Sequence, residues 1–349
     1  MIIKTQKGVY GVSFGQFQIE ITGQCNMYCK HCRNSFDRVS VMPVKQIIKI
    51  IKLAIKNGDS DLELVLSGGE PLTHPDFKKI IAEIKKLGIK SLFITTNGSL
   101  LSEEHIALFK DIKNIMISVS LDDIDPKKND VFRGFVGAHN RALSAINLLV
   151  GAGIKTSMRV SLRPEKIKDL EKIAEFAYRL KINRLSVAGI FPSGKARENK
   201  KLLMTPSQKK EFLTKLFKLR DKYLPKGLKI STNEPLQNIC RSNKNNCSVP
   251  NTKNIILNGC SAAASFNVMA NGDLTPCAML NLPIPNTYSL TLKEIESRYK
   301  SSDIIKNILD MNIKGKCGSC NLKYSCGGCR ARALAKYGDY LAQDPDCWI

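Results

Sequence analysis

Residues 17–32 read FQIEITGQCNMYCKHC, an alternating apolar run followed by three cysteines. The stretch Phe17 to Thr22 predicts a buried strand, and Cys25, Cys29 and Cys32 come directly after it. A closed structural zinc site takes four ligands, whereas three thiolates on a four-iron cluster leave one iron open to another molecule. The three cysteines therefore favour an iron-sulfur cluster, with a zinc site as the alternative.

From residue 17 to about 190, short β-branched runs alternate with amphipathic segments. This alternation predicts an α/β fold in which parallel strands are joined by crossover helices and ligand sites lie at the carboxyl ends of the strands. A Lys-rich helix near 206–222 and a strand near 228–231 are expected to follow. The expected strands are 17–22, 62–66, 91–95, 114–121, 155–162 and 184–189, and the expected helices are 43–57, 75–87, 102–110, 138–152 and 166–180.

The composition changes from Pro235 onward, where Asn, Cys and Gly become frequent and the expected elements become short. A chain of 349 residues is long for one compact domain. We therefore expect one domain over 1–225 and a smaller Cys-rich domain over 226–349.

The chain has twelve cysteines but no amino-terminal apolar stretch that resembles an export signal. No later run approaches the length of a membrane span. Because cytosolic thiols are normally kept reduced, metal or cluster ligation is a better explanation of these cysteines than a disulfide framework. We expect a cytoplasmic protein without a membrane partner.

The net charge of +23 is compatible with an acidic partner, although a solvated basic surface is the commoner cause. Lys45, Lys49, Lys52 and Lys56, for example, have the spacing of one solvated helix face. The sequence contains no helix-turn-helix, zinc-finger or aromatic RNA-binding pattern. A nucleic-acid partner is therefore not expected.

Three further polar segments close the next expected strands. SGGEPL spans 67–72, TTNG spans 95–98 and SVSLD spans 118–122. Paired glycines let backbone carbonyls approach a ligand closely, and a carboxylate such as Glu70 can receive an ammonium group. Taken singly, each segment is also typical of an ordinary turn at the end of a strand.

CNMYCKHC, SGGEPL, TTNG and SVSLD in this order resemble the radical S-adenosylmethionine (SAM) superfamily, and the resemblance covers nearly the whole chain. It implies a partial (β/α)6 radical SAM barrel and a [4Fe-4S] cluster whose open iron binds SAM. An electron from the cluster then cleaves SAM to methionine and a 5'-deoxyadenosyl radical. The residues that the resemblance places around SAM are His31, Gly68, Gly69, Glu70, Asn97, Ser120, Asp122, Ser161 and Ala188.

From Cys260 the sequence reads CSAAASFNVMANGDLTPC, and later KCGSCNLKYSCGGCRARA and DPDCW. These segments resemble the SPASM domain, which holds auxiliary iron-sulfur clusters. Two residues separate Cys326 from Cys329, where three are more usual. CxxC pairs also suit tetrahedral zinc, so a pair of zinc knuckles is the alternative. The resemblance implies one cluster on Cys317, Cys320, Cys326 and Cys347, and another on Cys260, Cys277 and Cys329.

Cys240 and Cys247 remain after these assignments. Each is an ordinary loop cysteine, a fourth ligand for the three-cysteine auxiliary cluster, or a hydrogen-atom donor in catalysis. Cys247 is the stronger candidate because it is closer in sequence to Cys260.

The resemblance implies hydrogen abstraction from a substrate. A ribosomal peptide or protein ranks first, to be crosslinked, epimerised or oxidised. The peptide's leader could be acidic, and its recognition would need a separate leader-binding protein or the barrel itself. A tetrapyrrole is the alternative substrate, because CGGCRARALAKYGDYLAQDPDC also resembles tetrapyrrole-modifying members. A flavodoxin or ferredoxin is the expected reductant. A non-catalytic iron-sulfur scaffold or electron-transfer protein is the alternative of another class.

Overall fold

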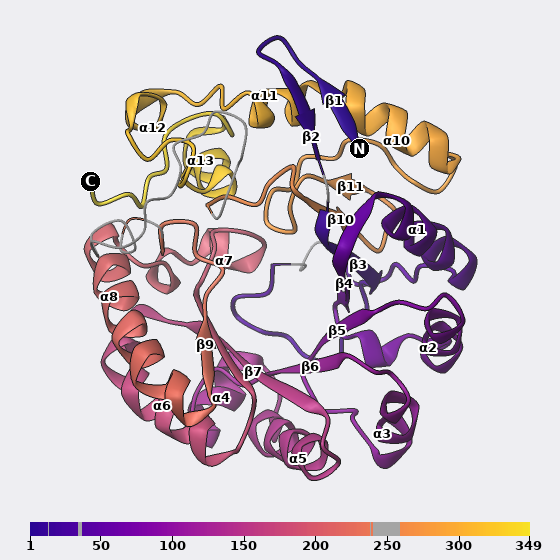
Figure 1. The fold of residues 1–349 in the computed structure, drawn as a ribbon. Helices are drawn as coiled ribbons and strands as arrows, with labels where there is room; N and C mark the ends of the chain where they lie inside the picture. Colours follow the sequence, from indigo (N-terminus) through magenta and orange to yellow (C-terminus); the bar gives the residue numbers. More distant parts are fainter. Residues whose placement is uncertain (13, 34–36, 238, 240–258) are drawn as a thin grey trace.

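Parallel strands curve around a central space, and helices cover their outer side (Figure 1). The computed structural model describes the chain except residues 13, 34–36, 238 and 240–258. Nine strands form one sheet in the order β11-β10-β3-β4-β5-β6-β7-β8-β9, and β1 and β2 form a separate hairpin. Adjacent strands from β10 through β9 pair in parallel. The α/β class with a parallel sheet is therefore confirmed.

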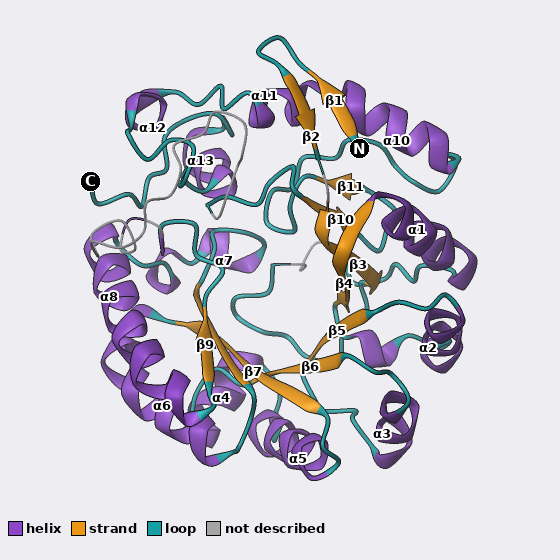
Figure 2. Ribbon diagram, viewed as in Figure 1, coloured by secondary structure: helices purple, strands orange, loops and turns teal. Residues whose placement is uncertain are grey.

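The colouring of Figure 2 shows strands and helices alternating along the ring. The strands are β1 (Ile2–Lys4), β2 (Val9–Gly11), β3 (Phe14–Thr22), β4 (Gly58–Gly68), β5 (Ser91–Thr96), β6 (Ile115–Ser120), β7 (Lys155–Leu162), β8 (Arg184–Gly189), β9 (Lys229–Ser231), β10 (Ser265–Val268) and β11 (Leu274–Thr275). The α-helices are α1 (Val44–Asn57), α2 (Phe77–Lys86), α3 (Glu103–Lys110), α4 (Pro126–Arg133), α5 (Ala138–Gly151), α6 (Leu170–Arg179), α7 (Lys195–Glu198), α8 (Pro206–Tyr223), α10 (Leu292–Ser301), α11 (Asp303–Leu309), α12 (Gly315–Ser319) and α13 (Arg330–Tyr337).

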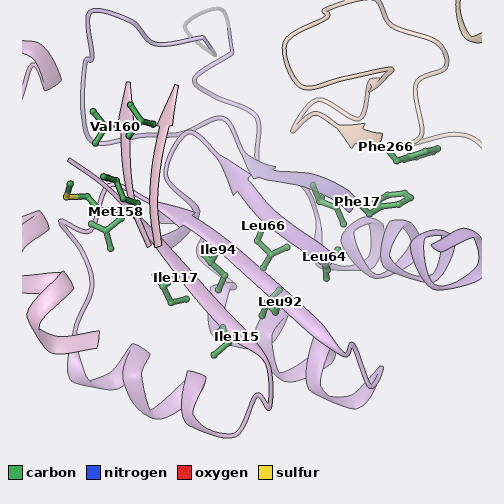
Figure 3. Close-up of a cluster of buried hydrophobic side chains, with 14 of the residues drawn as sticks. Phe17, Leu64, Leu66, Leu92, Ile94, Ile115, Ile117, Met158, Val160 and Phe266 are labelled. Atoms are coloured by element: carbon green, nitrogen blue, oxygen red, sulfur yellow. The ribbon is translucent and has the colours of Figure 1, made fainter. Parts of the chain in front are cut away.

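The two faces of the sheet differ sharply in polarity. Since successive side chains of a strand point to opposite faces, every second residue belongs to the same environment. Leu92 and Ile94 of β5 pack in the outer core under the helices (Figure 3), whereas Phe93 and Thr95 face the central space. The outer apolar layer therefore holds the helices, and the inner face is left for polar side chains.

The Cys-rich region contributes two strands, β10 and β11, to the same sheet. Strand β10 pairs in parallel with β3, with Phe266 opposite Phe17. These two rings stack with their centroids 4.2 Å apart (Figure 3). The sheet consequently continues across the boundary expected near residue 225, because β9 and β10 both lie beyond it.

A buried charge network joins α13 to the segment after β9. The guanidinium of Arg332 lies 2.7 Å from Glu234 and 2.7 Å from Asp344, and all three side chains are at most 1% exposed. Lys209 of α8 also contacts Glu234, at 3.2 Å. Burial alone would raise the pKa of Glu234, but the charges of Arg332 and Lys209 lower it overall. The network therefore anchors the carboxyl-terminal region to the barrel.

The six expected strands and the expected helices are present, with small shifts at their ends. The helix expected over 166–180 begins as a 3-10 helix, Pro164–Asp169, before α6. Helix α4 was missed, although its signals are in the sequence: Asp125 caps it, Pro126 begins it, and Gly134 ends it in the left-handed conformation. Within the described part of the chain, no helix combines the length and apolar character that crossing a membrane requires.

Replacement of Arg332 by Gln should lower the free energy of unfolding by about 3–5 kcal/mol, because buried Asp344 loses its cationic partner and Glu234 keeps only Lys209. Urea titration of the purified protein, followed by circular dichroism, measures the change. The matched control is Lys314→Gln, which removes an ion pair with Asp339 on the surface and should change stability little. Equal effects of the two substitutions would contradict the structural role of the network.

Candidate active site

The inner face of the sheet encloses a cavity of about 480 Å³. Its walls come from strands β3 to β10, from the CNMYCKHC loop and from the Cys-rich region. The nine residues that the resemblance places around SAM fall into two groups relative to this cavity. Its lining includes His31, Gly68, Gly69, Asn97, Ser120, Ser161 and Ala188, whereas Glu70 and Asp122 are buried behind it.

The three cysteines of CNMYCKHC lie in a loop after β3. The turn at Gly68 and Gly69 packs closely against the start of this loop. Cys25, Cys29 and Cys32 all line the cavity. A Cβ atom on Gly69 would lie 2.2 Å from the carbonyl oxygen of Gln24, so a side chain there would displace the loop. The amide of Gly69 also donates to the Thr22 carbonyl at 2.8 Å. The paired glycines thus fix the loop by close backbone contact.

His31 forms a flat wall of the cavity. Its ring stacks on Phe132 of α4, with centroids 4.5 Å apart and planes 9° apart. Burial lowers the pKa of His31 to about 4, although the charge of Asp122 opposes the shift. The imidazole is consequently neutral at physiological pH and can offer an apolar face to a ring.

Asp122 and Glu70 support the wall from behind. Asp122 accepts from the Ser161 amide at 2.7 Å and pairs with Arg133 at 2.7 Å. Glu70 accepts from the Thr96 hydroxyl at 2.7 Å and from the Asn97 amide at 2.6 Å. Burial raises the pKa of Glu70, and these donors oppose that rise. In this structure both carboxylates position neighbouring wall residues, and neither faces the cavity.

The carboxyl-terminal cysteines form two groups. Cys260, Cys277 and Cys329 line the same cavity as the cysteines of the first loop. Burial raises the pKa of Cys326 to about 12, and the nearby thiols of Cys317 and Cys347 add to the rise. Burial also raises the pKa of Cys347, with contributions from Cys317 and Cys320. These contributions place Cys326 and Cys347 near Cys317, and Cys347 near Cys320. The assignment of the cysteines to two clusters stays a prediction.

The donor set fits iron-sulfur clusters in its chemistry. Burial raises the pKa values of Cys25 and Cys277 to about 11, so a bound metal must displace their protons. Backbone amides already point at the sulfur atoms, since Met27 N lies 3.4 Å from the Cys25 sulfur and Met279 N lies 3.4 Å from the Cys277 sulfur. Such N–H groups favour the thiolate form that a metal binds. Among the described residues, no three His, Cys, Asp or Glu side chains converge as the ligands of a single ion.

Arg33 connects the two cysteine regions. It directly follows Cys32, donates to the carbonyl oxygen of Ala278 at 2.9 Å and pairs with buried Glu20 of β3 at 2.5 Å. Ala278 in turn directly follows Cys277. One guanidinium therefore sets the position of one cysteine loop relative to the other.

Several cavity arginines were not identified from the sequence. Arg133, Arg159 and Arg184 line the cavity beside Arg33. The alternation of side chains along β7 could have identified one of them. Arg159 lies two residues before Ser161, so both side chains lie on the same face of the strand. Cys240 and Cys247, the two candidate catalytic or fourth-ligand cysteines, lie outside the described residues.

Comparisons with known proteins agree with this geometry. Residues 19–177 match the family model of the Radical SAM superfamily. The AdoMet-dependent heme synthase of Methanosarcina barkeri is 27% identical over 338 residues, which cover 94% of each chain. The PqqA peptide cyclase of Rhizobium meliloti is 25% identical, over 94% of this chain and 85% of the relative.

The fold is also that of a solved structure, Streptococcus suis SuiB bound to precursor peptide SuiA. The TM-score is 0.78 at 22% sequence identity, over 97% of this chain and 76% of the SuiB chain. Residues 19–177 therefore match the radical SAM superfamily, and the Cys-rich region that follows them lies within the fold that the chain shares with SuiB.

Proposed function

We propose that this chain is a radical SAM enzyme that abstracts hydrogen from a carboxylate-bearing substrate and oxidises it, with a tetrapyrrole as the first candidate. The observation that carries the proposal is the shared cavity, in which Cys25, Cys29 and Cys32 face the same space as Cys260, Cys277 and Cys329. A four-iron cluster on the first three thiolates would bind SAM and supply the electron that yields the 5'-deoxyadenosyl radical. The 5'-deoxyadenosyl radical would take the hydrogen atom, and auxiliary clusters on the other cysteines would accept the electron that the substrate radical then gives up.

The chain's own residues would bind and orient SAM. Gly68 and Gly69 line the cavity beside the cysteine loop, where the methionyl group would bind. Glu70 would act by holding the Thr96 and Asn97 segment, since its carboxylate is already engaged there. The neutral ring of His31 would pack against the adenine, and Asp122 would hold Ser161 and Arg133 in place.

The tetrapyrrole candidate is favoured by relatives that match almost the whole chain. Three AdoMet-dependent heme synthases, 23% to 27% identical, each cover 94% of it. The segment 326–347, CGGCRARALAKYGDYLAQDPDC, resembles tetrapyrrole-modifying members as well. This ranking differs from the one drawn from the sequence, which put peptides first.

A peptide substrate is the second candidate. PqqA peptide cyclases match over 94% and 95% of this chain, at 25% and 23% identity. Under this candidate an acidic leader would suit the +23 charge, with recognition by the barrel or by a separate protein. Both candidates share three further expectations. The reductant is a flavodoxin or ferredoxin, the location is cytoplasmic, and the chain divides into domains over 1–225 and 226–349.

Product analysis tests the proposal and separates its two forms. The anaerobically reconstituted protein is incubated with SAM and a strong reductant, alone, with iron coproporphyrin III, or with short peptides encoded beside its gene. We expect 5'-deoxyadenosine in every reaction and a decarboxylated porphyrin in the second. A mass change confined to a peptide would establish the second candidate, and absence of 5'-deoxyadenosine would contradict both.

Replacement of Cys25, Cys29 and Cys32 together by Ala should abolish 5'-deoxyadenosine formation, because no thiolate remains to hold the site-differentiated cluster. Iron and acid-labile sulfide should fall by one cluster's content while auxiliary iron remains. Iron analysis and chromatography of the nucleoside products measure the two effects. The assignment is wrong if the triple variant forms 5'-deoxyadenosine at the parental rate.

Gly69→Ala should lower SAM affinity and iron at the first site, because its Cβ would lie 2.2 Å from the carbonyl oxygen of Gln24 and 2.4 Å from that of Gly23. The overpacking should also cost about 1–3 kcal/mol of stability. Gly151→Ala is the matched control, since a Cβ there meets no atom within 4 Å. Equilibrium SAM binding and iron content are measured on both variants. Indistinguishable values would show that close contact at Gly69 does not matter.

A further inference from the structure

The charged side chains around the cavity are almost all cationic. Six arginines line it, and Glu63 is the one carboxylate among the described lining residues. The arginines are Arg33, Arg38, Arg133, Arg159, Arg184 and Arg330. Since a buried charge without a partner is costly, each of these guanidinium groups should have an acceptor.

Four of the six have acceptors within the protein. Arg33 pairs with Glu20, and Arg133 pairs with Asp122. Arg38 donates to the carbonyls of Cys25 and Met27, and Arg330 donates to those of Tyr340 and Ala342. The presence of these four arginines is therefore explained by their contacts within the protein.

Arg159 and Arg184 are different. Neither side chain makes a hydrogen bond or an ion pair with any residue in the described parts of the chain, and the Nε atom of Arg184 is buried without a partner. Burial lowers the pKa of Arg159, and the charges of Arg33 and Arg133 add to this effect, whereas the charge of Asp122 opposes it. Both groups thus face the cavity with unused donors.

The sheet places these two arginines next to each other. Arg159 lies opposite Ser186 and Arg184 lies opposite Ser157, so the two are diagonal neighbours on the inner face of β7 and β8. The flanking Met158 and Val160 point into the outer core (Figure 3), which leaves Arg159 on the cavity side. Two adjacent guanidinium forks are well suited to carboxylate groups, which each fork can bind through two parallel hydrogen bonds.

We propose that Arg159 and Arg184 form an anchor for carboxylate of the substrate, an inference that rests on the proposed radical SAM function. The other possible source of a carboxylate is the methionyl group of SAM. Arg184 is the first residue of β8, and at about 3.3 Å per residue it lies roughly 13 Å along the strand from Ala188 at the carboxyl end. The cysteine loop follows the carboxyl end of β3, so Arg184 lies at the end of the sheet away from the expected SAM position. Arg159 lies nearer to that position, two residues before Ser161.

The test compares Arg159→Gln, Arg184→Gln and the charge-retaining Arg159→Lys. Arg298→Gln is the matched control, because it removes the same charge from an exposed position on α10. Two equilibrium titrations are made on each reconstituted protein, one with SAM and one with iron coproporphyrin III, which carries propionate groups. The tetramethyl ester of the same porphyrin keeps the ring and lacks the carboxylates.

The unsubstituted protein and Arg298→Gln should bind the acid well and the ester poorly. Each Gln variant should bind the acid about tenfold or more weakly, as expected for a lost hydrogen bond to a charged group, and SAM affinity should fall less. Arg159→Lys should recover part of the loss, because it restores the charge without the fork.

Three results would overturn the anchor. Unchanged porphyrin affinity in both Gln variants would remove it while leaving the proposed function intact. A selective loss of SAM affinity would assign the arginines to the SAM carboxylate. Failure of the unsubstituted protein to bind the porphyrin, with SAM cleavage retained, would reject the tetrapyrrole candidate and the anchor together.

Discussion

The contact of Arg33 with the Ala278 carbonyl is the interaction on which the site's geometry depends. Arg33 follows the last cysteine of one loop and Ala278 follows a cysteine of the other, so one side chain fixes two loops that are distant in sequence. The same guanidinium also pairs with buried Glu20, which fixes Arg33 to strand β3. Charge-assisted bonds of this kind are strong and directional, which suits them to positioning.

The distribution of charge around the cavity follows from the same arrangement. The carboxylates of Glu20, Glu70 and Asp122 lie behind the wall, where each is bound to a guanidinium or to backbone and hydroxyl donors. These three carboxylates therefore stabilise the residues that line the cavity and do not face a ligand themselves. The surface that meets a ligand is left with arginines, and a cavity of this sign attracts anions.

Much of the fold could be predicted because it rests on local patterns. Apolar and more polar residues alternate in segments such as Leu92 to Thr95, and strand-like segments alternate with helical ones along the chain. Both patterns identify parallel strands without any knowledge of long-range contacts. The CNMYCKHC loop and the paired glycines could be found for the same reason, since their chemistry is contiguous. The pairing of β10 with β3 could not, because it joins residues about 250 positions apart through a strand of four residues. The hydrogen bond from the Asn97 amide to Glu70 could not be predicted either, because it joins two strand ends that only the tertiary structure brings together.

The parallel pairing of β10 with β3 has a consequence for how the molecule avoids self-association. Without the segment 265–275, β3 would present a long row of unpaired backbone groups flanked by Phe14 and Phe17. Such an edge invites pairing with another chain and leads to aggregation. The Cys-rich region thus shields the sheet edge as well as carrying thiols, and a fragment that ends before it would expose the edge that the full chain keeps covered.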